Sequence, residues 1–145
     1  MTHVSTMRFA VFLLFVLAAP ARAQSLPEIM QGLYGSATDP ATACEVNPHE
    51  MNFLASPPHL FLSWNQPRTT ASGASESGRR YDLLAMDAGS FTLRREGETE
   101  RTASGDRPIW ILRRTTEPEG YCWGGADWPL VRCEDQQLRC SAPVS

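Results

Sequence analysis

Lysine is absent from this sequence, and all 13 of its Lys-or-Arg positions are arginines. A P-loop needs a lysine in G-x-x-x-x-G-K-[ST], so this class of nucleotide site is excluded. Neither Cys-x-x-Cys nor Gly-x-Ser-x-Gly occurs, which argues against a thioredoxin-like redox centre and a serine-hydrolase nucleophile. Beyond residue 3 the only histidines are His49 and His59. A catalytic triad therefore has few possible bases.

A long hydrophobic run is also missing. The longest, Phe9–Ala19, has 11 residues, whereas a membrane-spanning helix needs about 20. The run follows a weakly basic segment, residues 1–8, and precedes Ala21-Arg22-Ala23, which is typical of a signal-peptidase site. We expect a cleaved secretory signal over residues 1–23 and one mature domain over residues 24–145. An uncleaved membrane anchor is the alternative.

The charge of the predicted mature chain excludes two classes of partner. Loss of Arg8 and Arg22 leaves 11 basic and 16 acidic side chains, a formal net charge of −5. An acidic chain has no general attraction for nucleic acid. It also lacks the basic patch that attracts proteins to anionic lipid. We expect a periplasmic or extracellular protein that binds neither.

The four cysteines, Cys44, Cys122, Cys133 and Cys140, all follow the predicted cleavage site. An even number in an exported chain indicates two disulfides. We favour Cys133–Cys140, which closes a short loop, and Cys44–Cys122, which ties the early chain to the C-terminal stretch; the other two pairings stay open. A zinc site is the alternative, but the spacing lacks a C-x2-4-C pair. We expect no bound metal or cofactor.

The local patterns are those of short strands. Ser25 and Glu28 form the capping-box spelling S-x-x-E and predict a short helix over residues 26–31. Residues 65–80 contain no apolar side chain larger than alanine and predict a mobile polar loop. Alternating apolar residues and turn signals predict strands at 33–35, 50–55, 59–64, 81–85, 91–93, 99–103 and 108–112, and a last hairpin of 130–133 with 138–140.

Together these patterns predict an all-β domain, a small antiparallel barrel or sandwich of seven or eight short strands with one N-terminal helix. Sequential hairpins favour the barrel. The opening, a short helix followed by Gly32-Leu33-Tyr34, is similar to lipocalin-like barrels, which carry Gly-x-Trp at this place. The resemblance covers a few residues, implies a barrel, and assigns no functional residue. Periplasmic lysozyme inhibitors share the size and disulfide content, an analogy of architecture only.

The richest stretch for recognition is residues 121–140, which hold three cysteines and two tryptophans. The favoured interpretation is that both tryptophans are core or lid residues of a small domain, because tryptophan is large and apolar as well as enriched at binding sites. The alternative is that Trp123, Asp127 and Trp128 form a ligand surface, with rings that stack on a ligand and a carboxylate that orients it.

The preferred hypothesis for function is a non-catalytic domain that binds a protein or a small ligand. A cavity lined by Trp64, Trp110 or Trp123 with one or two polar groups would favour a small ligand. A structural accessory subunit of a cell-envelope complex, held through residues 65–80 or the 94–101 hairpin, is one alternative. A large exposed apolar patch would favour it.

A small hydrolase is the other alternative. It would need two facing carboxylates, and the candidates are Asp82, Asp87, Asp127, Glu134 and Asp135. A metal site built from His49, Glu50 and His59 is also conceivable, although Asn47-Pro48-His49 fits a turn that leads into a strand. No constellation identifies an enzyme, and we expect no catalytic activity.

Overall fold

The chain forms a closed barrel of eight antiparallel strands in the computed structural model, which describes residues 19–20 and 22–141. Each strand pairs with its neighbours in sequence, and β1 pairs with β8 to close the ring. The prediction of an all-β domain is confirmed, and the barrel is chosen over the sandwich. Most of the predicted signal peptide lies outside the described residues.

The elements are α1 (Leu26–Met30), β1 (Gly32–Ser36), the 3-10 turn η1 (Pro40–Thr42), β2 (His49–Ala55), β3 (Pro58–Thr69), β4 (Ser75–Met86), β5 (Ser90–Arg95), β6 (Trp110–Thr116), β7 (Glu119–Gly125) and β8 (Glu134–Arg139).

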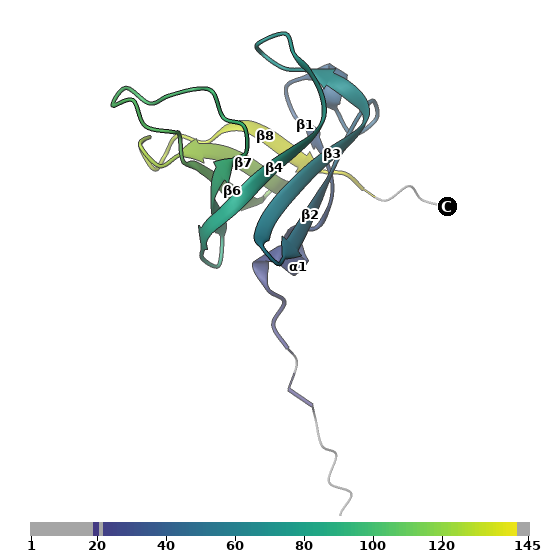
Figure 1. The fold of residues 1–145 in the computed structure, drawn as a ribbon. Helices are drawn as coiled ribbons and strands as arrows, with labels where there is room; N and C mark the ends of the chain where they lie inside the picture. The colour runs from purple at the N-terminus through teal and green to yellow at the C-terminus, as the bar shows by residue number, and fades with distance from the viewer. Residues whose placement is uncertain (1–18, 21, 142–145) are drawn as a thin grey trace, which may run out of the picture.

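The short helix α1 lies at one end of the barrel (Figure 1). It begins as predicted, with a capping box in which Ser25 and Glu28 satisfy each other's backbone N–H groups. Arg139 at the end of β8 fixes the other end of α1. Its guanidinium donates to the carbonyls of Ile29, at 2.6 Å, and Gln31, at 2.8 Å, and lies over the ring of Tyr34. The first helix and the last strand are thereby joined.

Apolar side chains fill the barrel nearest α1. Alternate residues of each strand point inward, and in this half the inward positions are large and apolar. Full burial stabilises each such side chain by roughly 1.5–3 kcal/mol. The most deeply buried members are Met30, Tyr34, Met51, Leu60, Phe91, Leu93 and Leu112.

The disulfides join Cys44 to Cys140 and Cys122 to Cys133, so the favoured pairing was wrong. The reason is β8. Cys133 and Cys140 flank its six residues, Glu134–Arg139, and an extended strand separates its ends by roughly 20 Å. A disulfide needs Cα atoms within about 7 Å. Instead, Cys140 follows β8 beside β1 and meets Cys44, with the two Cα atoms 5.5 Å apart.

The predicted loop over residues 65–80 is also wrong for most of its length. β3 continues to Thr69 and β4 begins at Ser75, so only residues 70–74 turn. After a register shift between Ser63 and Arg68, the strands pair again at Arg68–Glu76 and Thr69–Ser75. The lack of apolar residues did not indicate a loop here, because the inward side chains of this hairpin are charged and pair with one another, as Arg68, Glu76 and Arg79 do.

Two further strand predictions fail. Residues 99–103 belong to an irregular segment, 96–109, and β5 pairs with β6 rather than with this segment. The last hairpin does not form, because β8 is a single strand over residues that were predicted to turn. Barrel closure explains this, since β8 pairs with β7 on one side and with β1 on the other.

Candidate functional site

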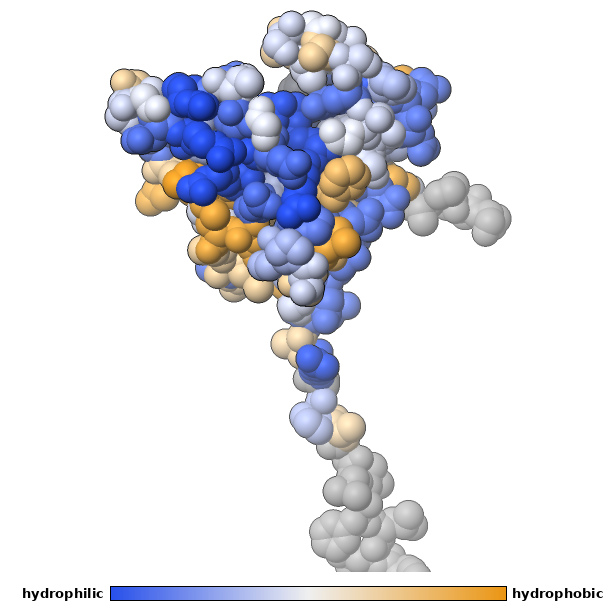
Figure 2. Space-filling model, in the orientation of Figure 1, coloured by the Kyte–Doolittle hydropathy of each residue, from blue (hydrophilic) through white to orange (hydrophobic). Residues whose placement is uncertain are grey.

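The end of the barrel opposite α1 is open, and we call it the mouth. The turns 37–48, 70–74, 96–109 and 126–133 surround it (Figure 1). On the side seen in Figure 2, hydrophilic residues predominate near the mouth, and hydrophobic residues gather nearer α1. The polar residues of the strands therefore concentrate at one end.

A cavity of about 440 Å³ occupies the barrel interior below the mouth. Its volume falls in the range of about 300–1,000 Å³ that is usual for small-molecule sites. Three of the four tryptophans, Trp64, Trp110 and Trp123, line it together with Tyr81 and Tyr121. The cavity thus has the tryptophans that we expected of a small-ligand site, but its lining contains many polar and charged groups instead of the one or two that we expected.

A second cavity, of about 250 Å³, adjoins the first. The two share Arg79, Arg95, Trp110, Trp123 and Asp135 as lining residues, among others. A ligand in the first cavity could therefore extend into the second without crossing the barrel wall.

Three arginines converge on one carboxylate beside the cavity. Glu76 lies 2.7 Å from Arg68 and 2.6 Å from Arg79, and Arg95 stands 3.9 Å away. Burial alone would raise the pKa of the Glu76 carboxyl, but the hydrogen bond from Arg68 and the charges of Arg68 and Arg79 hold it below its usual value. Glu76 is therefore an anion that fixes the arginines in place.

One of these arginines also packs on the aromatic wall. The guanidinium of Arg68 lies 4.1 Å from the centre of the Trp64 ring, a cation–π contact. The indole Nε1 of Trp64 is buried and has no hydrogen-bond partner among the described residues. A buried N–H without a partner is rare in native structures and is explained by a role or by an unseen partner.

Glu98 is almost fully buried, with 1% of its side chain exposed. Its carboxylate accepts hydrogen bonds from the indole of Trp110, at 3.1 Å, and from the backbone N–H of Glu100, at 3.2 Å. Arg95 lies 3.9 Å from it. The inward turn of Glu98 draws the 96–109 segment over the cavity.

A histidine and a tyrosine form the cavity floor. His49 Nε2 and the hydroxyl of Tyr121 share a hydrogen bond of 2.5 Å. Burial, reinforced by the nearby charge of Arg68, lowers the pKa of His49 to about 3. The imidazole is therefore neutral at physiological pH, and burial likewise raises the pKa of Tyr121 well above its usual value.

Asp135 contributes a carboxyl group from β8, the strand opposite β4 in the ring. Its backbone lies in the left-handed region, with φ of 54°, and Gln137 donates a hydrogen bond to its side chain. Burial raises the pKa of Asp135. The cavity consequently has arginines on one wall and an acid on the other.

The structure separates the residues that the sequence predicted as a ligand surface. Trp123 lines both cavities, and Trp128 lines the second, where it meets Trp110 edge to face. Asp127 is exposed on the loop after β7 and lines neither cavity, because the turn from Gly125 to Trp128 directs it away. Their part in ligand binding stays a prediction.

Sequence reasoning missed Arg68, Arg79, Arg95 and Glu98. A signal for three of them existed. Arg68 keeps the alternation of Leu60, Leu62 and Trp64, Arg79 keeps that of Tyr81 and Leu83, and Arg95 keeps that of Phe91 and Leu93. The alternation was not extended into the polar stretch.

The other predicted constellations are dispersed. His49 points into the barrel, whereas Glu50 is exposed, and His59 bonds to the carbonyl of Pro57 on the outside. Of the five candidate carboxylates, Glu134 and Asp135 line a cavity. Asp87 instead accepts hydrogen bonds within its own turn, and Asp82 pairs with Arg80.

Within residues 19–20 and 22–141, no helix has the length and apolarity needed to cross a membrane. Comparison of the chain with protein-family models, with curated proteins and with solved structures finds no match. The residues and geometry of the cavity are therefore the basis for inferring a function.

Proposed function

We propose that this protein is an exported, non-catalytic binding protein that takes a small organic molecule with a planar ring into the barrel mouth. The observation that carries the proposal is the cavity of about 440 Å³ among Trp64, Trp110 and Trp123. A small barrel with a wholly apolar filling would leave no such space. Here the apolar filling ends at Leu62 and Leu112, and polar and aromatic side chains line the rest.

The aromatic side chains that line the cavity support a planar ligand. Tyr81 and Trp123 lie with ring centres 5.0 Å apart, and Tyr121 meets Trp123 edge to face at 5.8 Å. Aromatic faces bind flat rings through stacking and edge contacts worth about 0.5–1.5 kcal/mol each. The buried Nε1 of Trp64 adds a hydrogen-bond donor that a ligand oxygen would satisfy.

Export is the second part of the proposal. Two intramolecular disulfides are typical of proteins from oxidising compartments. The pattern of residues 1–23 supports secretion, and a periplasmic or extracellular location follows from it. A binding protein in either compartment would encounter small molecules from outside the cytoplasm.

The test is a titration of the mature chain, residues 24–145, with 2-naphthamide, followed by ¹H–¹⁵N NMR. The four indole N–H signals are separate reporters: three belong to residues of the first cavity, and the fourth belongs to Trp128, which lines the second. We expect saturable shifts of the Trp64 and Trp123 signals. The Trp64 shift should be the largest, because its N–H has no partner among the described residues. Unchanged indole signals at millimolar probe would refute the proposal.

A further inference from the structure

Arg95 differs from its two arginine neighbours in how its donors are used. A guanidinium has five N–H donors in a planar fork. Arg79 donates to Glu76 and to the hydroxyl of Tyr81, and Arg68 donates twice to Glu76. Among the hydrogen bonds of the described residues, Arg95 side-chain nitrogens donate none. Its two carboxylate neighbours, Glu76 and Glu98, both stand 3.9 Å away.

The two carboxylates are already engaged by other donors. Arg68 and Arg79 lie 2.7 and 2.6 Å from Oε1 of Glu76, and Arg79 Nε donates to Oε2 at 3.3 Å. The Trp110 indole and the Glu100 amide take those of Glu98. Glu76 and Glu98 therefore attract the Arg95 guanidinium electrostatically, and its N–H donors remain available for a ligand.

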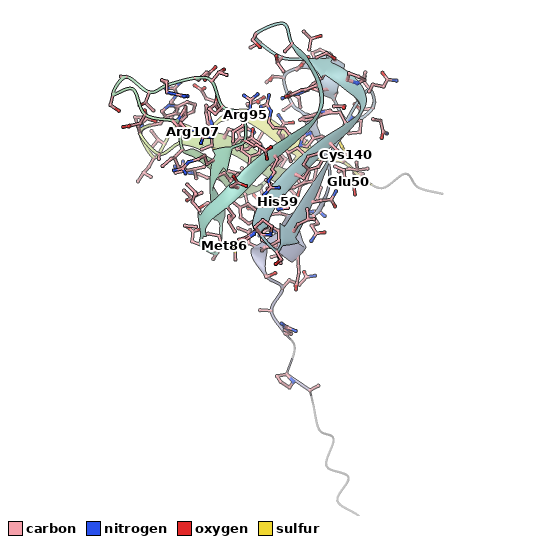
Figure 3. The ribbon with its side chains drawn as sticks, viewed as in Figure 1. Glu50, His59, Met86, Arg95, Arg107 and Cys140 are labelled. Atoms are coloured by element: carbon pink, nitrogen blue, oxygen red, sulfur yellow. A yellow bond between two sulfur atoms is a disulfide. The ribbon has the colours of Figure 1, made fainter. Side chains whose placement is uncertain are left out.

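The position of Arg95 fits a role in recognition. It is the last residue of β5, it follows the inward Leu93 with the same orientation, and it lies at the mouth (Figure 3). It lines both cavities, as Trp110 and Trp123 do, and its side chain keeps 29% of its surface exposed. A molecule in either cavity would meet its free donors.

We propose that Arg95 binds the anionic group of the ligand, which is a planar organic anion of the carboxylate class. The inference rests on the proposed function and names the kind of ligand for that same site. The planar guanidinium fork matches the two oxygens of a carboxylate. Trp110 and Trp123 line the same two cavities as Arg95, so they offer aromatic surfaces to a ring attached to the carboxylate.

Two probes of nearly equal shape test the inference. 2-Naphthoate and 2-naphthamide share a ring, but only the first carries a charge at pH 7. We expect the parent protein to bind 2-naphthoate about tenfold more tightly, because a charge-assisted hydrogen bond to the carboxylate is stronger than the neutral hydrogen bond to the amide. Isothermal titration calorimetry of both probes measures the ratio.

Arg95→Gln should abolish this preference, with a loss of about tenfold for 2-naphthoate and a change below about twofold for 2-naphthamide. Arg94→Gln is the matched control. It removes the same charge from the adjacent residue of β5, whose side chain points to the other face of the sheet and lines neither cavity. It should leave both affinities within about twofold.

The outcomes separate the two proposals. If 2-naphthamide binds and Arg95→Gln leaves the ratio unchanged, the role of Arg95 is refuted while the binding function stands. If neither probe binds the parent protein, both are refuted. Should Arg95→Gln fail to fold, Arg95→Lys takes its place. That variant keeps the charge but not the fork, and retention of the full tenfold preference would also refute the inference.

Discussion

At the scale of single residues, burial decides the chemistry of the cavity floor. His49 is 2% exposed, lies among the rings of Tyr34, Trp64 and Tyr121, and has a pKa of about 3. The unfolded chain, in contrast, protonates this imidazole near its ordinary pKa of 6.5. The unfolded state therefore binds an extra proton between pH 6.5 and pH 3, and folding stability must fall as the pH decreases through that window.

We predict that the free energy of unfolding of the mature protein decreases by about 1–2 kcal/mol between pH 7 and pH 5 because of His49. His49→Gln should remove most of that slope, since glutamine does not titrate. Urea unfolding followed by tryptophan fluorescence at pH 7, 6 and 5 measures it. His59→Gln on the outer surface is the control and should keep the parental slope. An unchanged slope in His49→Gln would contradict the burial argument.

At the scale of elements, the two disulfides constrain different lengths of chain. Cys44–Cys140 links residues 96 positions apart and joins the β1–β2 connection to the end of β8. Cys122–Cys133 spans 11 positions and joins β7 to the segment that precedes β8. In the chain-entropy model, a long loop restricts the unfolded state more than a short one, about 4.7 against about 3 kcal/mol.

We predict that the double substitution of Cys44 and Cys140 by serine destabilises the protein more than the double substitution of Cys122 and Cys133. The difference should be about 1–2 kcal/mol. Urea midpoints at equal protein concentration, with the parent protein as reference, compare the two. Equal midpoints would mean that loop length does not govern the stabilisation. Peptide mapping without reduction checks the pairing directly.

At the scale of the whole molecule, the ring of strands depends on a close backbone contact between β7 and β8. Gly120 of β7 faces the backbone of β8, and a Cβ at this residue would lie 1.9 Å from the carbonyl oxygen of Gln137. A backbone atom cannot move aside as a flexible side chain can. Any side chain at residue 120 therefore forces β7 and β8 apart.

Gly120→Ala should lower the free energy of unfolding by about 2–4 kcal/mol, because overpacking against backbone displaces β7 from β8, which also pairs with β1 to close the ring. Gly89→Ala is the control. The nearest atom to a Cβ there is an Asp87 oxygen at 4.0 Å, and we expect almost no change. Chemical denaturation of both variants is the measurement. A fully stable Gly120→Ala protein would show that β7 and β8 can separate at little cost.

The sequence alone determined the elements that local rules govern. Ser25 and Glu28 define the start of α1, and the alternation of Leu60, Leu62 and Trp64 defines β3, because capping and strand period act over a few residues. Sequential hairpins then favoured a barrel. The apolar half of the interior was predictable for the same reason.

Only the tertiary structure decided which distant residues meet. Cys44 pairs with Cys140 because ring closure sets β8 beside β1, a contact that no local pattern records. The Arg68, Arg79 and Arg95 cluster was missed for a related reason. In the sequence, each arginine has the pattern of a solvated surface residue. In the barrel, three neighbouring strands place the three arginines around Glu76, and their inward faces form one cavity wall.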